Sequence, residues 1–373
     1  MTTFNETLKR MKYSASINKG LDSEQSKLNL SVGAPDLLPP REIFESLNFN
    51  SINNLFNYKP SKGTISGRKN LHRIILKNDD SINPLLNICL CSGAKQGIYL
   101  TLKTCLNNGD RVLILQPYWL SYPDICESLS LKYSICDFDF DTLSYSFEAI
   151  KKQVLSENVK AVIINNPNNP SGRILSEGFL SELCQFLNNN SIWLIIDEVY
   201  KDLTFSGISN LHHGLTSYLN VVRIGSMSKS MAIPGMRIGY VVGNPDFIEN
   251  FNLFNQHINT CINSISTFVL EGLTKELYES FVLHSIEIYK SRFDFVRRLL
   301  EKKGFYVIPV EASFYAMVHA TQRYNSLYDC INDFEKKSII VTEGINYGSQ
   351  FKDYFRICLT ASETELAKYL IKI

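Results

Sequence analysis

The sequence predicts an α/β protein whose strands form a mostly parallel sheet. Short runs of branched aliphatic residues, the composition typical of buried strands, recur along the chain. Between these runs lie longer segments in which apolar side chains recur at helical spacing. Strands that alternate with helices in this way form parallel sheets with helices packed on them.

The expected strands and helices follow in chain order. "ICLCS" is expected to be a strand that leads into a helix at Gly93. This helix has Ile98, Leu102 and Leu106 on one face and Gly109 as its stop. A second helix repeats the spacing at Leu180, Leu183, Cys184 and Leu187. Further strands are expected at "RVLIL" (111–115), "VKAVII" (159–164), "IWLII" (192–196), "VVRI" (from 221) and "RIGYVV" (from 237).

The character of the chain changes near residue 250. A stretch that begins "FVLHSIEIYK" reads as a long helix ending at Gly304, and short strands follow around "SFYAMV", "SIIVTEG" and "YFRICLT". This change predicts a second, smaller α+β domain. The predicted division is an N-terminal arm over residues 1–40 that packs on the small domain, a large α/β domain over 41–250, and the small domain over 251–373.

The composition favours a cytoplasmic protein without nucleic-acid or membrane partners. Its 373 residues include 38 Lys and Arg against 37 Asp and Glu, so no net field draws it to a polyanion. Nine scattered cysteines, without a second pair at zinc-site spacing, predict reduced thiols and no metal site. No signal peptide and no apolar run long enough to span a bilayer is expected.

Unusual residues gather directly after the predicted strands. In open α/β sheets, ligands bind beyond the carboxyl ends of the strands, so these positions are the candidate site. Each residue also has a structural alternative: a tryptophan can be core, an aspartate can cap a helix, and "NNPNNPSG" can be a turn. The residues in question are Trp119, Asn169, Asp197, Tyr200, Ser226 and Lys229.

One helix start and three charged residues each have a functional and a structural interpretation. "SGAK" at a helix start offers N–H groups to a phosphate, or is a simple cap. Arg237 suits a phosphate or an ordinary salt bridge. Arg356, inside the apolar "YFRICLT", needs either a carboxylate ligand or a structural acid. Lys229 is either a surface lysine or an amine that forms a Schiff base with an aldehyde, with Asp197 holding a cationic ring nitrogen.

The order of motifs resembles a known family over nearly the whole chain. "SVGAPD", "NYKPSKGTISGRKNL", "SGAKQ", "PYWLSYP", "NNPNNPSG", "DEVY", "SMSK", "ASFY" and "YFRICLT" follow one another at suitable spacings. In this respect the chain is similar to the class I and II aminotransferases that use pyridoxal phosphate (PLP), and most of all to the aspartate/prephenate branch. The resemblance implies fold type I, a three-layer α/β/α domain with a smaller α+β domain, and a homodimer with active sites at its interface.

The resemblance also implies the role of each site residue. Lys229 is expected to form the Schiff base and to carry the proton as general acid–base. Asp197 is expected to hold the pyridinium proton, while Tyr200 and Asn169 hydrogen-bond the phenolic oxygen and Trp119 stacks on the ring. The expected phosphate ligands are the backbone amides of Gly93, Ala94 and Lys95, with Ser226, Arg237 and a Tyr58 that reaches across the dimer.

The substrate contacts follow from the same resemblance. Arg356 is expected to grip the α-carboxylate, and Gly33 lies against it. Lys95 stands where the branch contacts the distal carboxylate of a dicarboxylic substrate, unless it acts only through its backbone. Ser16 stands where the branch often has a substrate-contacting threonine, while Trp119 and Asn169 complete the substrate site. Departures at "MAIP", at "EASFY" and between residues 344 and 356 leave the identity of the amino acid open.

These residues predict an aminotransferase of amino-acid metabolism and biosynthesis. It would transfer an amino group between an aspartate- or glutamate-like L-amino acid and a 2-oxo acid. The alternative is another PLP enzyme on the same scaffold, such as a β-lyase, a cyclase, an oxidase or a synthase. A non-catalytic PLP-sensing regulator is a third reading, which the lack of a basic helix–turn–helix pattern disfavours.

Overall fold

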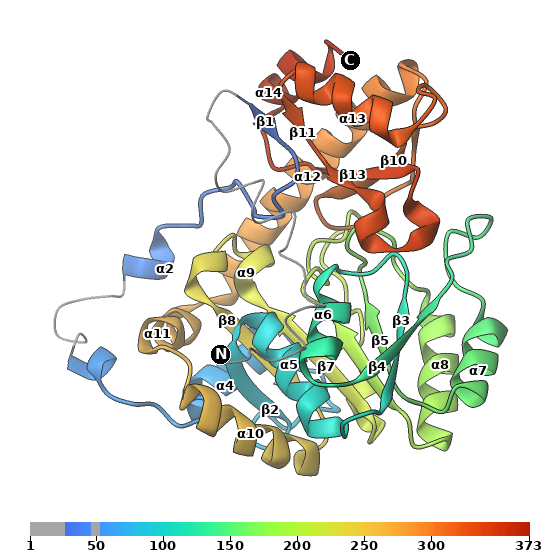
Figure 1. Ribbon diagram of the computed structural model, residues 1–373. Helices are drawn as coiled ribbons and strands as arrows, with labels where there is room; N and C mark the ends of the chain where they lie inside the picture. The colour runs from blue at the N-terminus through green and yellow to red at the C-terminus, as the bar shows by residue number, and fades with distance from the viewer. Residues whose placement is uncertain (1–26, 46–52) are drawn as a thin grey trace, which may run out of the picture.

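The structure is a computed structural model that describes residues 27–45 and 53–373 (Figure 1). The described residues form a larger sheet of seven strands, a smaller sheet of four and a two-stranded pair. The larger sheet lies in the lower part of the view and the smaller one above it. Ser16, predicted to contact substrate, lies outside the described residues. None of the described helices is long and apolar enough to cross a membrane.

The larger sheet has seven strands in the order β2-β8-β7-β6-β5-β3-β4. β7, β6, β5, β3 and β4 run parallel to one another, and only β8 is antiparallel to its neighbours. The predicted α/β fold with a mostly parallel sheet is therefore confirmed. The strands are β2 Ile88–Ser92, β3 Arg111–Leu115, β4 Lys132–Cys136, β5 Val159–Asn165, β6 Trp193–Asp197, β7 Val221–Ser226 and β8 Ile238–Val242.

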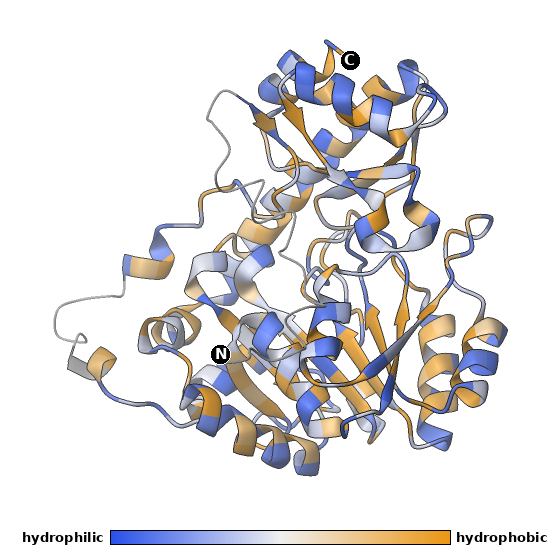
Figure 2. Ribbon diagram, viewed as in Figure 1, coloured by the Kyte–Doolittle hydropathy of each residue, from blue (hydrophilic) through white to orange (hydrophobic). Residues whose placement is uncertain are grey.

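Helices cover both faces of this sheet because each strand sends successive side chains to opposite faces. In β3, Val112 and Ile114 pack in one core cluster, while Leu113 and Leu115 pack in another. The first cluster includes side chains of α5 Gly93–Cys105, α6 Ser121–Ser128 and α10 Pro245–Asn259. The second includes side chains of α7 Phe147–Ser156 and α8 Glu177–Asn189. Figure 2 shows the strands of this layer as mostly hydrophobic.

The helix that begins at Gly93 ends earlier than predicted. It stops at Cys105, and Leu106 is already extended, with φ −130° and ψ 148°. Gly109 therefore serves the following turn, at φ 87°, and its N–H donates to the carbonyl of Ser130. Leu106 is nevertheless buried in the same cluster as Ile98 and Leu102, so helical spacing predicted its burial but not its backbone conformation.

The smaller sheet has four antiparallel strands in the order β12-β13-β10-β9. The long helix predicted before it is α12, which spans Lys275–Lys302 and is followed by Gly304 in the left-handed region. The strands are β9 Tyr306–Val307, β10 Tyr315–His319, β12 Thr342–Glu343 and β13 Tyr354–Cys358, with helices α13 Leu327–Lys336 and α14 Glu363–Leu370.

Residues 27–45 contact the C-terminal part of the chain. β1 (Leu28–Asn29) pairs in parallel with β11 (Ile339–Ile340), and Arg292 of α12 forms an ion pair with Asp36. The border predicted at residue 250 falls inside α10, which contacts α5 and β2. The division into an arm, a large domain and a small domain stays a prediction.

The remaining elements are helices of ten residues or fewer. α4 (Ile65–Ile74) contacts α11 (Ser264–Gly272), and α9 (Met227–Ser230) follows β7 directly. The others are α2 Glu42–Glu45, η2 Asn53–Phe56, η3 Leu215–Ser217, η4 Pro234–Met236, η5 Gly344–Tyr347 and η6 Ser349–Phe351.

Candidate active site

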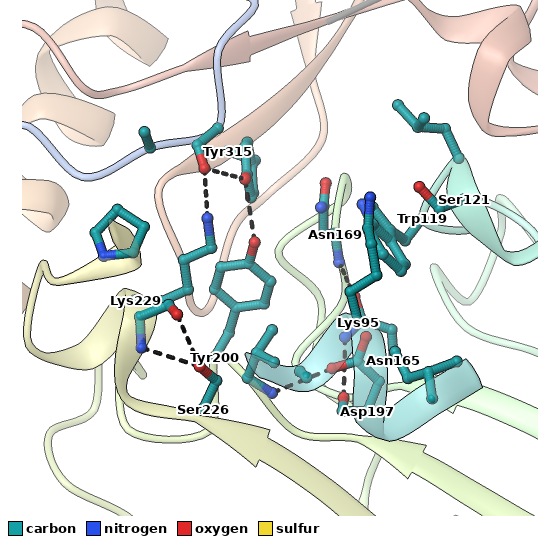
Figure 3. A pocket seen from close by; sticks show the side chains of 18 of the residues that line it. Lys95, Trp119, Ser121, Asn165, Asn169, Asp197, Tyr200, Ser226, Lys229 and Tyr315 are labelled. Carbon is teal, nitrogen blue, oxygen red and sulfur yellow. Dashed lines mark hydrogen bonds between the residues drawn. The ribbon is translucent and has the colours of Figure 1, made fainter. Parts of the chain in front are cut away.

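A cavity of about 280 Å³ lies at the carboxyl ends of the parallel strands (Figure 3). Asn165, Asp197 and Ser226 line it, and they are the last residues of β5, β6 and β7. Parallel strands end at one edge of the sheet, so three neighbouring strands deliver polar side chains to one place. Arg356 of β13 and Tyr315 of β10 close the cavity from the smaller sheet.

Most of the predicted site residues line this cavity. Gly93 does not line it itself, but it adjoins Ala94 at the start of α5. Tyr58 is 87% exposed and does not line it. The predicted residues that do line it are Gly33, Ala94, Lys95, Trp119, Asn169, Asp197, Tyr200, Ser226, Lys229, Arg237 and Arg356.

Lys229 lies in α9, one turn beyond the end of β7. Its Nζ donates a hydrogen bond to the carbonyl of Gly33 and lies 5.7 Å from the ring centroid of Phe314. Burial lowers the pKa of Lys229 to about 8, and the nearby positive charges of Arg356 and Arg237 act in the same direction. A larger fraction of this amine is therefore neutral and nucleophilic near neutral pH than for a surface lysine. The surface-lysine alternative does not describe this setting.

Asp197 is buried on the opposite side of the cavity floor. Its Oδ2 accepts a hydrogen bond of 2.7 Å from the hydroxyl of Tyr122. Burial raises the pKa of Asp197 to about 6, although the hydrogen bond from Tyr122 opposes the shift. A carboxylate in this position gains stability from any positive charge placed beside it, such as a protonated ring nitrogen.

Tyr122 was not predicted as a site residue. It lies three residues after Trp119 in "WLSY", and its N–H donates to the carbonyl of Trp119 in the turn that leads into α6. The two ring centroids lie 5.4 Å apart. A buried carboxylate such as that of Asp197 needs a hydrogen-bond donor, and this need was the indication that some side chain would serve as one. Nothing local identified which of the tyrosines would supply it.

The start of α5 forms a cradle for an anion. Gly93 has φ +78°, and a Cβ there would lie 2.2 Å from Nη2 of Arg237. A Cβ on Gly239 would lie 2.5 Å from the backbone of Gly93. The two glycines thus let the guanidinium and strand β8 approach the helix start closely. The first N–H groups of a helix have no partner within it, and together with Arg237 and Ser226 they suit a phosphate.

Arg356 is a buried cation in the cavity. It is 2% exposed, and among the residues that the structure describes no carboxylate lies within ion-pair distance of it. Nη1 donates to Oδ1 of Asn169 at 3.4 Å and Nη2 donates to the carbonyl of Ser31, while Nε has no partner in the described chain. The structural-acid alternative is therefore wrong for the described part of the chain. A carboxylate ligand would satisfy this guanidinium.

Two tyrosine rings flank Arg356. Its guanidinium carbon lies 4.5 Å from the ring centroid of Tyr315 and 5.2 Å from that of Tyr347. Neither tyrosine was predicted as a site residue, although "ASFY" was recognised as a motif. Tyr347 lies in η5, within the segment whose sequence departs from the family pattern.

Lys95 and Trp119 form a wall of the cavity. Nζ of Lys95 lies 4.9 Å from the ring centroid of Trp119. Burial lowers the pKa of Lys95, and the positive charge of Arg237 adds to this effect. The side chain of Lys95, and not only its backbone, faces the cavity.

Comparison with known proteins gives the relatives of this chain. The family model for "Aminotransferase class I and II" matches residues 25–373. A probable N-acetyl-LL-diaminopimelate aminotransferase of Bacillus subtilis is 25% identical over 93% of this chain and 88% of its own length. An aspartate aminotransferase of the same organism is 27% identical over 86% of this chain and 84% of its length. The structure of Thermus thermophilus aspartate aminotransferase with maleate matches with a TM-score of 0.91 at 22% identity, covering 100% and 99% of the two chains.

Proposed function

The chain belongs to the class I and II aminotransferases, and we propose that its amino donor is an aspartate- or glutamate-like L-amino acid. It is a PLP-dependent transferase of amino groups to 2-oxo acids. The residues that line the cavity fit the cofactor: an amine of lowered pKa, a buried acid and a cradle for a phosphate. When bound, PLP supplies an electron sink for the electrons of a broken bond at the α-carbon.

We infer that Lys229 is the residue that binds the aldehyde and moves the substrate proton. Its lowered pKa keeps part of the amine neutral, which both attack on a carbonyl and acceptance of a proton require. The carbonyl of Gly33 orients Nζ within the cavity. Once released from the aldehyde, the same amine is in place to act as a base and then as an acid.

We further infer how the other side chains hold the cofactor. Asp197, held by Tyr122, would pair with the ring nitrogen and keep it protonated. Tyr200 and Asn169 would hydrogen-bond the phenolic oxygen, and Trp119 would stack on the ring. The start of α5 with Ser226 and Arg237 holds the phosphate through the cradle described above.

The observation that carries the substrate proposal is Arg356. The buried guanidinium of Arg356 has no carboxylate partner among the residues that the structure describes, and it faces the same cavity as Lys229. An incoming α-carboxylate would be bound there and its α-carbon brought to the amine. Lys95, on the wall formed with Trp119, supplies a second positive charge for a distal carboxylate. Relatives named aspartate aminotransferase support this choice of substrate.

A panel of amino acids mixed with the PLP form tests the proposal. We expect aspartate or glutamate to convert the bound cofactor to its amino form, with one equivalent of 2-oxo acid per site. Alanine should react much more slowly. Release of pyruvate and ammonia without the amino form would instead identify a lyase and overturn the proposal.

We also propose that two copies of the chain form a homodimer. Tyr58 is highly exposed and outside its own cavity, as expected for a side chain that serves the neighbouring copy. Exposed apolar side chains lie on η2, α4, α10 and α11, and α11 contacts both η2 and α4. These side chains are Phe56, Ile65, Leu253, Ile258 and Ile265. Figure 1 shows α4, α10 and α11 in the same lower left part of the molecule. An apolar surface of this kind is typical of subunit interfaces.

We propose a cytoplasmic location and a role in amino-acid biosynthesis. All nine cysteines are free thiols, and most are buried, which suits a reducing compartment. The biosynthetic role is supported by relatives named for diaminopimelate and aspartate transamination.

A further inference from the structure

We propose that Tyr315 is a positioning residue that joins the lysine side of the site to the carboxylate side. Its hydroxyl acts through Tyr200 on the proton held at Lys229, and its ring fixes the plane of Arg356. The inference rests on the proposed roles of Lys229, Tyr200 and Arg356. It adds to them a residue that none of those roles includes.

The position of Tyr315 follows from strand pairing. β10 and β13 are antiparallel, with Tyr315 opposite Cys358 and Met317 opposite Arg356. Residues two apart on a strand share a face, so Tyr315 and Arg356 are diagonal neighbours on one face. This register places the ring centroid of Tyr315 at 4.5 Å from the guanidinium carbon. The ring of Tyr315 therefore packs against one face of the Arg356 guanidinium, which is itself almost fully buried.

The hydroxyl of Tyr315 contacts the other side of the site. It lies 3.0 Å from the hydroxyl of Tyr200 and 3.4 Å from the carbonyl oxygen of Gly33. The same carbonyl accepts the hydrogen bond from Nζ of Lys229. Figure 3 shows these groups as one connected set between Lys229 and Tyr200. A Cβ at Gly33 would lie 2.1 Å from this hydroxyl, so a glycine is needed for the approach.

One proton decides what the hydroxyl can do. A tyrosine has a single O–H to donate, so Tyr315 donates either to Gly33 or to Tyr200. When Tyr200 donates a hydrogen bond into the cavity, its oxygen can still accept a hydrogen bond from the hydroxyl of Tyr315. A hydrogen bond received in this way polarises Tyr200 and makes it a better donor. Tyr315 would thus strengthen the hydrogen bond that Tyr200 offers to the phenolic oxygen of the cofactor.

This chain of donors has a measurable consequence. A stronger hydrogen bond to the phenolic oxygen of the bound cofactor would reduce the negative charge on that oxygen. The Lys229 nitrogen would then lose its proton at lower pH, because less negative charge is left to stabilise the protonated form. Tyr315→Phe removes only the hydroxyl and keeps the ring. We expect the pH midpoint of the visible absorption band of the holoenzyme to rise by about half a unit to one unit.

The experiment is a pH titration of holoenzymes in a double-mutant cycle. Tyr200→Phe should raise the midpoint further than Tyr315→Phe, and the double variant should match Tyr200→Phe alone because Tyr315 acts through Tyr200. Tyr347→Phe is the control, since Tyr347 also flanks Arg356 but shares no hydrogen bond with Tyr200 in the described part of the chain. Its midpoint should equal that of the wild type. An unchanged midpoint in Tyr315→Phe, or additive shifts in the double variant, would overturn the role of the hydroxyl.

Binding of succinate, a non-reacting dicarboxylate, tests the ring. Tyr315→Phe should keep the wild-type Kd, whereas Tyr315→Leu should raise it by roughly tenfold or more because the cation loses its aromatic face. Equal affinity in Tyr315→Leu would overturn the role of the ring. If Tyr315→Leu does not fold, the two phenylalanine variants still decide the inference. A wild-type holoenzyme without a pH-dependent visible band would instead contradict the proposed function itself.

Discussion

At the scale of single residues, burial decides which side chains have unusual acidity. Lys229 and Asp197 lie in the same cavity, and burial moves their pKa values toward each other, to about 8 and about 6. In each case burial disfavours the charged form, so the folded protein keeps these charges at a cost in stability. We interpret this cost as the physical mark of a site prepared for a charged ligand.

Asp197 gives the first prediction, on the stability of the cofactor-free protein. Its pKa is raised from 3.8 in the unfolded reference to about 6, so its contribution to stability is fully present below about pH 4 and is lost as the pH rises through 6. Asp197→Asn removes the ionisable carboxyl and therefore the loss of stability that occurs when it ionises. The cofactor-free variant should be more stable than wild type at pH 7, by up to about 3 kcal/mol, and the difference should vanish near pH 4.

Thermal unfolding across this pH range, with and without PLP, checks the prediction. In the presence of PLP the order should reverse, because the variant lacks the anion that pairs with the ring nitrogen. A variant that is less stable than wild type at pH 7 without cofactor would show that burial does not raise this pKa.

Lys95 gives the second prediction, on substrate choice. Lys95→Ala removes the cation proposed to bind the distal carboxylate while leaving the backbone at the start of α5. We expect kcat/KM for aspartate to fall by roughly tenfold to a hundredfold, and that for alanine to change little. Lys103→Ala, at an exposed position of the same helix, is the matched control. Equal losses for both substrates would contradict the proposal.

Several of the predicted residues that line this cavity lie at or directly after the ends of strands. Asp197, Ser226 and Lys229 are placed by local sequence, since each lies at or just beyond the end of an aliphatic run. Tyr122 and Tyr315 were missed because their roles depend on contacts with residues 75 and 115 positions away. A tyrosine at either position has an equally good role in a core, so only the assembled fold separates the two cases.

At the scale of secondary-structure elements, the contact between β8 and the start of α5 sets the phosphate cradle. Gly239 of β8 meets the backbone of Gly93, where an added Cβ would lie 2.5 Å away. Backbone cannot move aside as a flexible side chain can. The strand therefore determines where the helix start lies relative to Arg237.

Gly239 gives the third prediction, on cofactor affinity. Gly239→Ala should push the start of α5 out of place and raise the Kd for PLP by about tenfold or more. Gly178→Ala in α8 is the control, because a Cβ there meets nothing within 4 Å. Its Kd should equal the wild-type value. Fluorescence titration of the cofactor-free proteins measures both, and unchanged PLP affinity in Gly239→Ala would contradict the cradle.

The sequence predicted the strands more accurately than the helix ends. "RVLIL" was predicted as 111–115 and is β3, because an aliphatic run has sharp limits. The helix from Gly93 was extended to Gly109, yet it ends at Cys105. Apolar spacing reports burial, and Leu106 is buried while extended, so the pattern continued beyond the helix. The missing information was the packing that ends the helix.

At the scale of the whole molecule, the fourth prediction concerns the dimer. Ile265 of α11 is exposed and lies within the proposed apolar interface. Ile265→Glu should yield monomers in light scattering and should lower PLP affinity, because Tyr58 of the neighbouring copy is lost from the site. Leu155→Glu, at an exposed position of α7 on the other helix layer, should leave the dimer intact. A monomeric wild type that binds PLP tightly would contradict the proposed assembly.

The two sheets explain why one cavity can serve both ends of a substrate. The larger sheet supplies Lys229 and Asp197 from its strand ends, and the smaller sheet supplies Arg356 and Tyr315. The sequence predicted the large and the small part separately, because the pattern of expected strands and helices changes near residue 250. Their meeting place was implied only by family resemblance, since it depends on packing between segments far apart in the chain.

The most direct test of the central claim is to identify the lysine that binds PLP. Borohydride reduction of the holoenzyme fixes the cofactor on the amine that holds it, and peptide mass spectrometry then locates it. We expect one phosphopyridoxyl group per chain, on Lys229, and none on a Lys229→Ala variant. Labelling of Lys95 or of another lysine in place of Lys229 would contradict the proposed role of Lys229.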